Sequence, residues 1–296
     1  MIKSKHFKRT AESTLLALPA FIIYSCIIIY PMFSVFHMSF FKWNGIPSSP
    51  MEFVGLNNYI SFFTDAKFQT ALFNICIFIL SGFVLILPVS FFLATVIQSK
   101  IKAKRFFRIS YFVPQVISRT AIALMWYFLL YPEGGPVATL FKVIGFENVN
   151  VNFLGSKVWA IYAITVINAW TYAGFNMLIF SSGLTAIPNE INEVATVDGA
   201  SKFQRLRYII IPMLKGSFQL FILNCVIGSI TTFEMVYATT GGGPGSASEV
   251  FGTLLYKNAF TYNNYGYSNA IGSFLIIASF IISLILNTVF SRGEKE

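Results

Sequence analysis

Residues 70–98 read TALFNICIFILSGFVLILPVSFFLATVIQ and contain no Asp, Glu, Lys or Arg. A helix that crosses the hydrocarbon core of a bilayer needs about 20 predominantly apolar residues. This stretch meets that requirement with residues to spare. It therefore predicts a helix that spans a membrane.

The same apolar character extends along the whole chain of 296 residues. Hydrophobic residues make up 55% and charged residues 11% of it, whereas soluble domains carry about 25% charged residues. The mean hydropathy is +0.67. We therefore predict an all-α integral membrane protein with six transmembrane helices, which cover residues 14–40, 70–98, 107–131, 158–185, 208–238 and 268–291.

The first predicted span follows a basic start, as a signal peptide would. The apolar region of a signal peptide is only about 7–15 residues long, whereas this run continues to Phe41. We therefore expect a retained first helix. The predicted organisation is a tail over 1–13, a transmembrane domain over 14–291 and a second tail over 292–296.

The distribution of lysine and arginine predicts the orientation. With the N-terminus inside, only five basic residues fall in outer segments: Lys42, Lys67, Lys142, Lys157 and Lys257. Arg119 and Lys215 lie within predicted spans, and every other basic residue lies in an inner segment. Because cytoplasmic loops carry the excess of Lys and Arg, we expect both termini in the cytoplasm.

Several functional classes are disfavoured by what the sequence contains. The net charge of +9 comes from residues between the apolar runs, so it predicts membrane orientation and no nucleic-acid partner. Cys26, Cys76 and Cys225 lie inside apolar runs without metal or disulfide spacing, so we expect free thiols and no metal site. The chain has no GxxxxGK[ST] phosphate loop and no HExxH pair. We therefore expect neither an ATPase nor any other enzyme.

The inner segment between the fourth and fifth predicted spans reads IPNEINEVATVDGASKFQRLRYIIIP over 187–212. Pro188 can start a helix, and Glu190 places negative charge near its N-terminus. Gly199 permits a turn or a close backbone approach. These residues predict a short amphipathic helix on the cytoplasmic surface, and on their own they fit an ordinary interfacial connector equally well.

The spacing of this segment resembles the EAA loop of ABC importer permeases. That pattern is Glu-Ala-Ala, three residues, Gly, nine residues and Ile-x-Leu-Pro. Five positions of this chain are in register with it: Glu193, Ala195, Gly199, Ile209 and Pro212. Val194 replaces the first Ala and Ile211 replaces the Leu, and both exchanges keep a small or apolar side chain.

The resemblance implies a coupling loop over 187–207, called the coupling segment below, whose helix docks in a cleft of a partner ATPase. Glu193 would make a charged contact there, and Gly199 would form the bend between two helix halves. Ala195, Asp198 and Ala200 would lie at the same contact. Mg-ATP would be bound by that partner, so this chain would need no cofactor of its own.

Four further stretches are similar to MalF-like carbohydrate-uptake permeases: residues 53–59 (FVGLNNY), 242–244 (GGP), 259–260 (AF) and 266–270 (GYSNA). The resemblance implies a permease subunit in a bacterial cytoplasmic membrane, importing a sugar or oligosaccharide by alternating access. The implied partners are a second, homologous permease, two ATPase subunits and an extracellular solute-binding protein. It does not indicate which sugar is carried.

Polar side chains in the fourth and fifth predicted spans could line a substrate pathway, because polar groups in lipid should face the bundle interior. By resemblance, Asn168, Tyr172, Phe175 and Asn176 match pocket positions, and Ser229 is a looser match. Such groups also commonly hold helices together, which is the alternative.

Arg119 and Glu234 are ionisable residues within predicted spans, and Glu234 is included in the predicted pathway. Arg119 departs from the family, which commonly has proline or a small residue there. The two could pair, or either could contact an acidic or polar sugar. An ion-coupled secondary transporter is the alternative function; it predicts inverted repeats or acidic relays, for which Glu234 alone gives little support.

Overall fold

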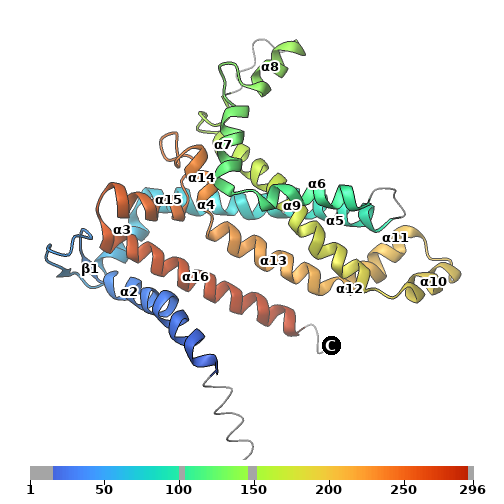
Figure 1. Ribbon diagram of the computed structural model, residues 1–296, viewed down its shortest axis with the longest axis horizontal. Coiled ribbons are helices and arrows are strands. Elements are labelled where there is room, and N and C mark those ends of the chain that lie inside the picture. Colours follow the sequence, from blue (N-terminus) through green and yellow to red (C-terminus); the bar gives the residue numbers. More distant parts are fainter. Residues whose placement is uncertain (1–15, 100–103, 146–151, 293–296) are drawn as a thin grey trace, which may run out of the picture. The chain divides into compact units, whose positions relative to one another are not determined.

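The computed structural model describes residues 16–99, 104–145 and 152–292 (Figure 1). The predicted tail over 1–13 and the end of the second tail lie outside these ranges, as do Lys100 and Lys102 of an inner segment. Within the described ranges the chain is helical apart from one short hairpin, β1 (Phe41–Lys42) with β2 (Glu52–Phe53). The predicted all-α class is therefore confirmed.

Four helices are long and apolar enough to cross a membrane: Leu16–Met38, Ala66–Gln98, Trp159–Ala186 and Tyr265–Phe290. Two bent pairs pass the same test. Lys104–Val116 and Arg119–Leu129 meet at 96°, and Lys202–Met213 and Lys215–Ile230 meet at 67°. If each bent pair is one span, the described chain has six.

The third and fifth spans differ from the continuous helices predicted over 107–131 and 208–238. The third breaks at Ser118, whose backbone is extended with φ −52° and ψ 132°. The fifth bends by 67° at Leu214 and ends at Ile230, and a separate helix starts at Glu234 after the non-helical Phe233. Summed hydropathy reports the length of an apolar run but not a local change of backbone direction, which explains the difference.

The described chain forms two compact units, and residues 16–64 and 255–276 belong to the first. Its elements are η1 (Ser25–Ile29), α2 (Tyr30–Met38), β1, β2, α3 (Asn57–Thr64), η4 (Lys257–Thr261) and the first half of α16 (Tyr265–Arg292).

A buried asparagine organises this first unit. Asn58 Nδ2 donates to the carbonyls of Ser39 at 2.8 Å and Phe41 at 3.0 Å. The next residue, Tyr59, shares a hydrogen bond between its hydroxyl and Ser273 Oγ at 2.8 Å. The FVGLNNY stretch is therefore built into the packing that joins α3 to the hairpin and α16.

The second unit contains the remaining described elements. They are α4 (Ala66–Ser81), η2 (Gly82–Ile86), α5 (Leu87–Gln98), α6 (Lys104–Val116), α7 (Arg119–Leu129), α8 (Pro136–Val143), α9 (Trp159–Ala186), α10 (Asn189–Val197), α11 (Lys202–Arg205), η3 (Leu206–Ile210), α12 (Ile211–Met213), α13 (Lys215–Ile230), α14 (Glu234–Thr239), α15 (Phe251–Tyr256) and the second half of α16.

Helix α9 is the centre of this second unit, in contact with α4, α5, α6 and α13 (Figure 1). Met177 and Phe180 on α9 are fully buried against α5 and against Phe221 of α13. Small residues let the neighbouring backbones come close. At Gly174, a Cβ atom would overlap the carbonyl of Tyr111 on α6.

The glycine-rich stretch 241–245 connects α14 to α15, as its composition predicts. Helix α4 holds this connection through one buried side chain. Asn74 Nδ2 donates to the carbonyls of Ala247 at 2.9 Å and Glu249 at 2.8 Å. Cys26, Cys76 and Cys225 are free in the structure, with Cys26 and Cys76 exposed and Cys225 half-buried.

Candidate functional site

A cavity of about 410 Å³ lies within the second unit, lined by α4, η2, α6, α7, α9, α13 and α14. Pockets for small ligands typically measure about 300–1,000 Å³. All six residues predicted for a substrate pathway line this cavity: Asn168, Tyr172, Phe175, Asn176, Ser229 and Glu234. The structure brings them together, and their contact with a substrate stays a prediction.

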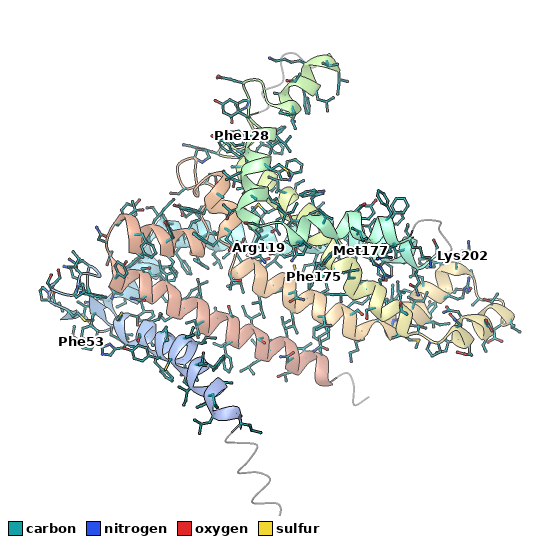
Figure 2. All side chains as sticks on the ribbon, in the orientation of Figure 1. Phe53, Arg119, Phe128, Phe175, Met177 and Lys202 are labelled. Atoms are coloured by element: carbon teal, nitrogen blue, oxygen red, sulfur yellow. The ribbon has the colours of Figure 1, made fainter. Side chains whose placement is uncertain are left out.

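Helix α9 supplies four of these side chains, because the 3.6-residue repeat of an α-helix places them on one face. Positions four, seven and eight residues after Asn168 fall on the same helical face. Phe175 contributes an aromatic ring there (Figure 2). Asn176 Nδ2 donates to the Tyr172 carbonyl at 3.0 Å. Its Oδ1 is buried and has no hydrogen-bond partner among the described residues.

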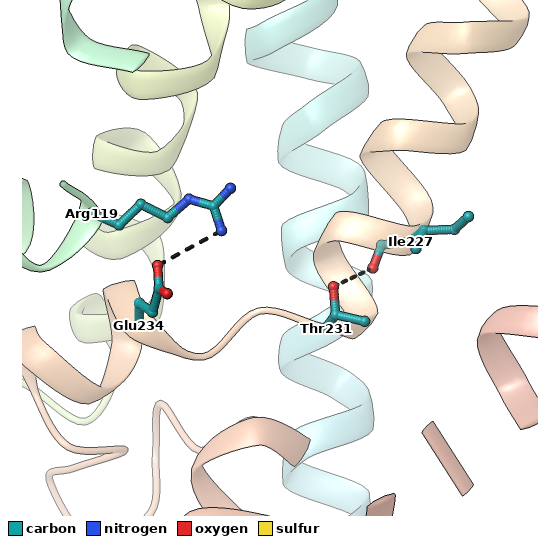
Figure 3. Close-up of polar contacts among 4 residues, drawn as sticks. All are labelled: Arg119, Ile227, Thr231 and Glu234. Carbon is teal, nitrogen blue, oxygen red and sulfur yellow. Dashed lines mark hydrogen bonds and ion pairs between the residues drawn. The ribbon is translucent and has the colours of Figure 1, made fainter. Parts of the chain in front are cut away.

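The end of α13 supplies the opposite wall. Ser229 Oγ donates to the Cys225 carbonyl at 2.7 Å, so this hydroxyl already serves its own helix. Thr231 Oγ1 likewise donates to the Ile227 carbonyl at 2.9 Å, at the point where α13 ends (Figure 3). The chain then turns through Phe233 and begins α14 with Glu234.

Arg119 and Glu234 form an ion pair at this cavity (Figure 3). Arg119 Nη1 lies 3.7 Å from Glu234 Oε2, and the two side chains are 49% and 51% exposed. The Arg119 guanidinium carbon also lies 5.3 Å from the centre of the Tyr172 ring. Pairing, one of the alternatives open from the sequence, is therefore what the structure contains.

Gln115 also lines the cavity and was not among the residues predicted from the sequence. Its Oε1 is buried without a hydrogen-bond partner among the described residues. The available signal was a polar side chain directly after Pro114, inside an otherwise apolar run. Phe221 and Phe233 were missed as well, because aromatic residues are common in all the predicted spans.

The predicted coupling helix is present as α10, which ends in a Schellman motif. The Gly199 amide donates to the Thr196 carbonyl at 3.1 Å, and the Ala200 amide donates to the Ala195 carbonyl at 2.9 Å. Gly199 has φ +77°, a conformation that glycine adopts without strain. Ser201 then caps α11 through a reciprocal hydrogen-bond pair with Gln204. The predicted turn at Gly199 is confirmed.

The coupling segment exposes both charged and apolar side chains. Glu193 and Asp198 are exposed, and neither makes an ion pair within the described ranges. Val197 is 87% and Phe203 72% exposed. Ala195 is buried and Ala200 is half-buried. Exposed apolar side chains beside unpaired carboxylates are typical of a surface that a partner covers.

The two halves of this segment are tied together. Arg205 Nη1 on α11 donates to Thr196 Oγ1 on α10 at 2.8 Å. Together with the Schellman and capping hydrogen bonds, this contact holds α10 and α11 as one unit. An internal polar cavity and an exposed pair of short helices are the features that the resemblance to importer permeases implies, and they define the expected class as a transport subunit.

The comparison with known families agrees with that class. The family described as "Binding-protein-dependent transport system inner membrane component" matches residues 86–293, and the chain belongs to it. The protein is therefore the non-catalytic, multi-pass inner-membrane permease of an ABC importer, which works with a binding protein and ATPase subunits. This result replaces the ion-coupled alternative.

Individual relatives match along most of the chain. It is 33% identical over 277 residues to the probable ABC transporter permease protein YurN of Bacillus subtilis, covering 93% of this chain and 94% of that one. It is 32% identical to MsmF of Streptococcus mutans, covering 86% and 87%. A bacterial ABC transporter involved in alginate import shares the fold with a TM-score of 0.84, at 21% identity and 99% coverage of both chains.

Proposed function

We propose that this chain forms half of the pore through which an ABC importer takes up a sugar or oligosaccharide. The observation that carries the proposal is the cavity. It combines aromatic rings with amide and hydroxyl groups, which is the chemistry that binds a polyhydroxylated ring. The Streptococcus mutans relative is named a multiple sugar-binding transport system permease, which supports the same class of cargo.

A second, homologous permease would complete the pore, and two ATPase subunits would drive it. Glu193, Asp198 and Gly199 would lie at the ATPase contact, together with Ala195 and Ala200. Closure of the ATPase dimer would move α10 and α11 as one unit and turn the cavity outward, and hydrolysis would reset it. A rigid element at a subunit interface can transmit such a two-state change.

The same proposal gives the chain an orientation. Both termini and the coupling segment would lie in the cytoplasm, and the connection at 131–157 and the glycine-rich stretch would lie outside. The transmembrane domain would cover 14–291, between short cytoplasmic tails. The extracellular binding protein would deliver its sugar to the outer side.

Reconstitution tests the function directly. The chain is assembled in liposomes with its partner permease and ATPase, and ATP hydrolysis and uptake are measured with binding protein that is empty or loaded with candidate oligosaccharides. We expect one loaded sugar to stimulate both activities. Uptake that an ion gradient drives without ATP, or hydrolysis indifferent to every loaded sugar, would contradict the proposal.

A further inference from the structure

Arg119 and Glu234, which form the ion pair, each lie at the start of a helix that follows a break in its span. Arg119 is the first residue of α7, directly after the 96° bend that follows α6. Glu234 is the first residue of α14, and three residues separate it from Ile230, where α13 ends. Among the described residues that line the cavity, these two are the only charged side chains. The cavity therefore carries both signs of charge and no net charge.

The Arg119–Glu234 ion pair is long, and its guanidinium and carboxylate groups make no hydrogen bonds to other described residues. A separation of 3.7 Å is longer than the roughly 2.7–2.9 Å of a charge-assisted hydrogen bond. Within the described ranges neither side chain makes a hydrogen bond to another residue. A guanidinium offers five N–H donors and a carboxylate only acceptors. Since both side chains are about half exposed, these groups are accessible in the cavity.

We propose that Arg119 and Glu234 act together as a selectivity site for uncharged, polyhydroxylated cargo. Neighbouring hydroxyls of a sugar ring would accept from the guanidinium and donate to the carboxylate. This inference rests on the proposed function and deepens it, because it names the charge class of the cargo and gives Arg119 a role.

Arg119 alone would suggest an acidic sugar, and its surroundings argue against one. A carboxylate bound to the guanidinium would lie close to that of Glu234, and the repulsion between two like charges at such a short distance disfavours it. Gln115 and Asn176 contribute carbonyl oxygens without partners in the described chain. Such oxygens accept from hydroxyls and would be unfavourable neighbours for a second carboxylate.

A purely structural role explains the pair less well. Helices α7 and α14 already pack through Ile122, Met235 and Val236, which are buried in one apolar cluster. A half-exposed ion pair adds little stability to such a contact. Joining two helices therefore does not require a pair of charges in the cavity.

The test measures ligand binding to the assembled importer in nanodiscs, without its binding protein. The probes are two neutral trisaccharides, maltotriose and raffinose, and the acidic trigalacturonate. Calorimetry measures the affinity of the importer for each probe. The wild type should bind a neutral probe more tightly. Glu234→Gln should raise the acidic-to-neutral affinity ratio at least about tenfold, and Arg119→Gln should lower it. The double variant is neutral again and should return to within about threefold of the wild-type ratio.

Glu133→Gln is the matched control, because it neutralises an exposed carboxylate that does not line the cavity. It should leave the ratio unchanged. Tighter wild-type binding of trigalacturonate, or a ratio that Glu234→Gln does not move, would overturn the selectivity site. So would the absence of binding by every probe in an importer with ATP-driven uptake. Failure of ATP-driven uptake itself would instead count against the proposed function.

Discussion

Gly199 combines an unusual backbone with open surroundings. Its φ is +77°, and a Cβ atom there would meet nothing within 4 Å. A substitution therefore acts through the backbone and through the partner surface, without crowding inside this chain. Only glycine and, less easily, Asn or Asp adopt this conformation routinely.

We expect Gly199→Asp to abolish sugar uptake while the protein still inserts, because it adds charge and bulk at the proposed ATPase contact. Gly199→Asn is the matched control for shape, since it lacks the charge and tolerates the same φ. Gly199→Asn should therefore retain more sugar uptake than Gly199→Asp. Uptake, ATPase rate and membrane abundance are the measurements, and intact uptake in Gly199→Asp would refute the coupling role.

Asn58 gives a second prediction at this scale. Its side chain satisfies two backbone carbonyls, and Asn58→Ala would leave them without those partners. Each lost partner costs about 1–3 kcal/mol when the group is buried. We expect a clearly lower thermal unfolding midpoint in detergent. The neighbouring Asn57 is exposed, so Asn57→Ala should change the midpoint little, and equal effects would contradict the role given to Asn58.

At the scale of elements, the contact between α6 and α9 depends on Gly174. A Cβ atom there would overlap the Tyr111 carbonyl and lie 3.1 Å from the Phe112 Cα. Because both are backbone atoms, no side-chain rotation relieves the clash. Gly174→Ala must therefore separate the two helices.

We expect Gly174→Ala to destabilise the protein by about 1–3 kcal/mol, the usual cost of overpacking. Gly216→Ala in α13 is the matched control. Nothing lies within 4 Å of its added Cβ, and Gly→Ala at a compatible helical site is stabilising by about 0.4–1 kcal/mol. Thermal unfolding of both variants in detergent tests this prediction. Similar unfolding midpoints for the two variants would mean that α6 can move away from α9 at little cost, which would contradict it.

At the scale of the whole molecule, the orientation can be measured. In a chain whose three native cysteines are replaced and which is expressed without its ATPase subunits, Glu133→Cys and Asp198→Cys place single thiols on two exposed connections. A membrane-impermeant maleimide should label position 133 in intact cells and position 198 only after permeabilisation. We expect this labelling pattern because the predicted inner segments carry the excess of Lys and Arg, which marks the cytoplasmic side. The reverse pattern would invert the proposed topology.

Most of the architecture could be predicted from the sequence. Length and hydropathy decide which segments can cross a bilayer, so the apolar stretches stand out without any tertiary information. The coupling segment was also predictable. Its helix and its turn depend on neighbours within six residues, through Pro188, Gly199 and the local hydrogen bonds that close around them.

The breaks in the third and fifth spans were decided only by the tertiary structure. Ser118 and Phe233 lie in runs apolar enough for continuous helices, and no local signal locates the change in direction. The bends bring Arg119 and Glu234, more than a hundred residues apart in the sequence, within 3.7 Å. They also expose Gln115 to the same cavity.

Sequence patterning therefore determined which segments enter the membrane, because that depends on local composition. The segment that would meet the ATPase in the proposed mechanism was identified by its resemblance to the EAA loop. The resemblance also predicted six residues that line the cavity, and only tertiary packing decided that Gln115 and Arg119 join them there. That choice depends on how α9 seats against α6 and α13, through close contacts such as Gly174 with Tyr111. Contacts between distant segments are not encoded in any one stretch of the chain, so the charge pairing at the cavity became visible only in three dimensions.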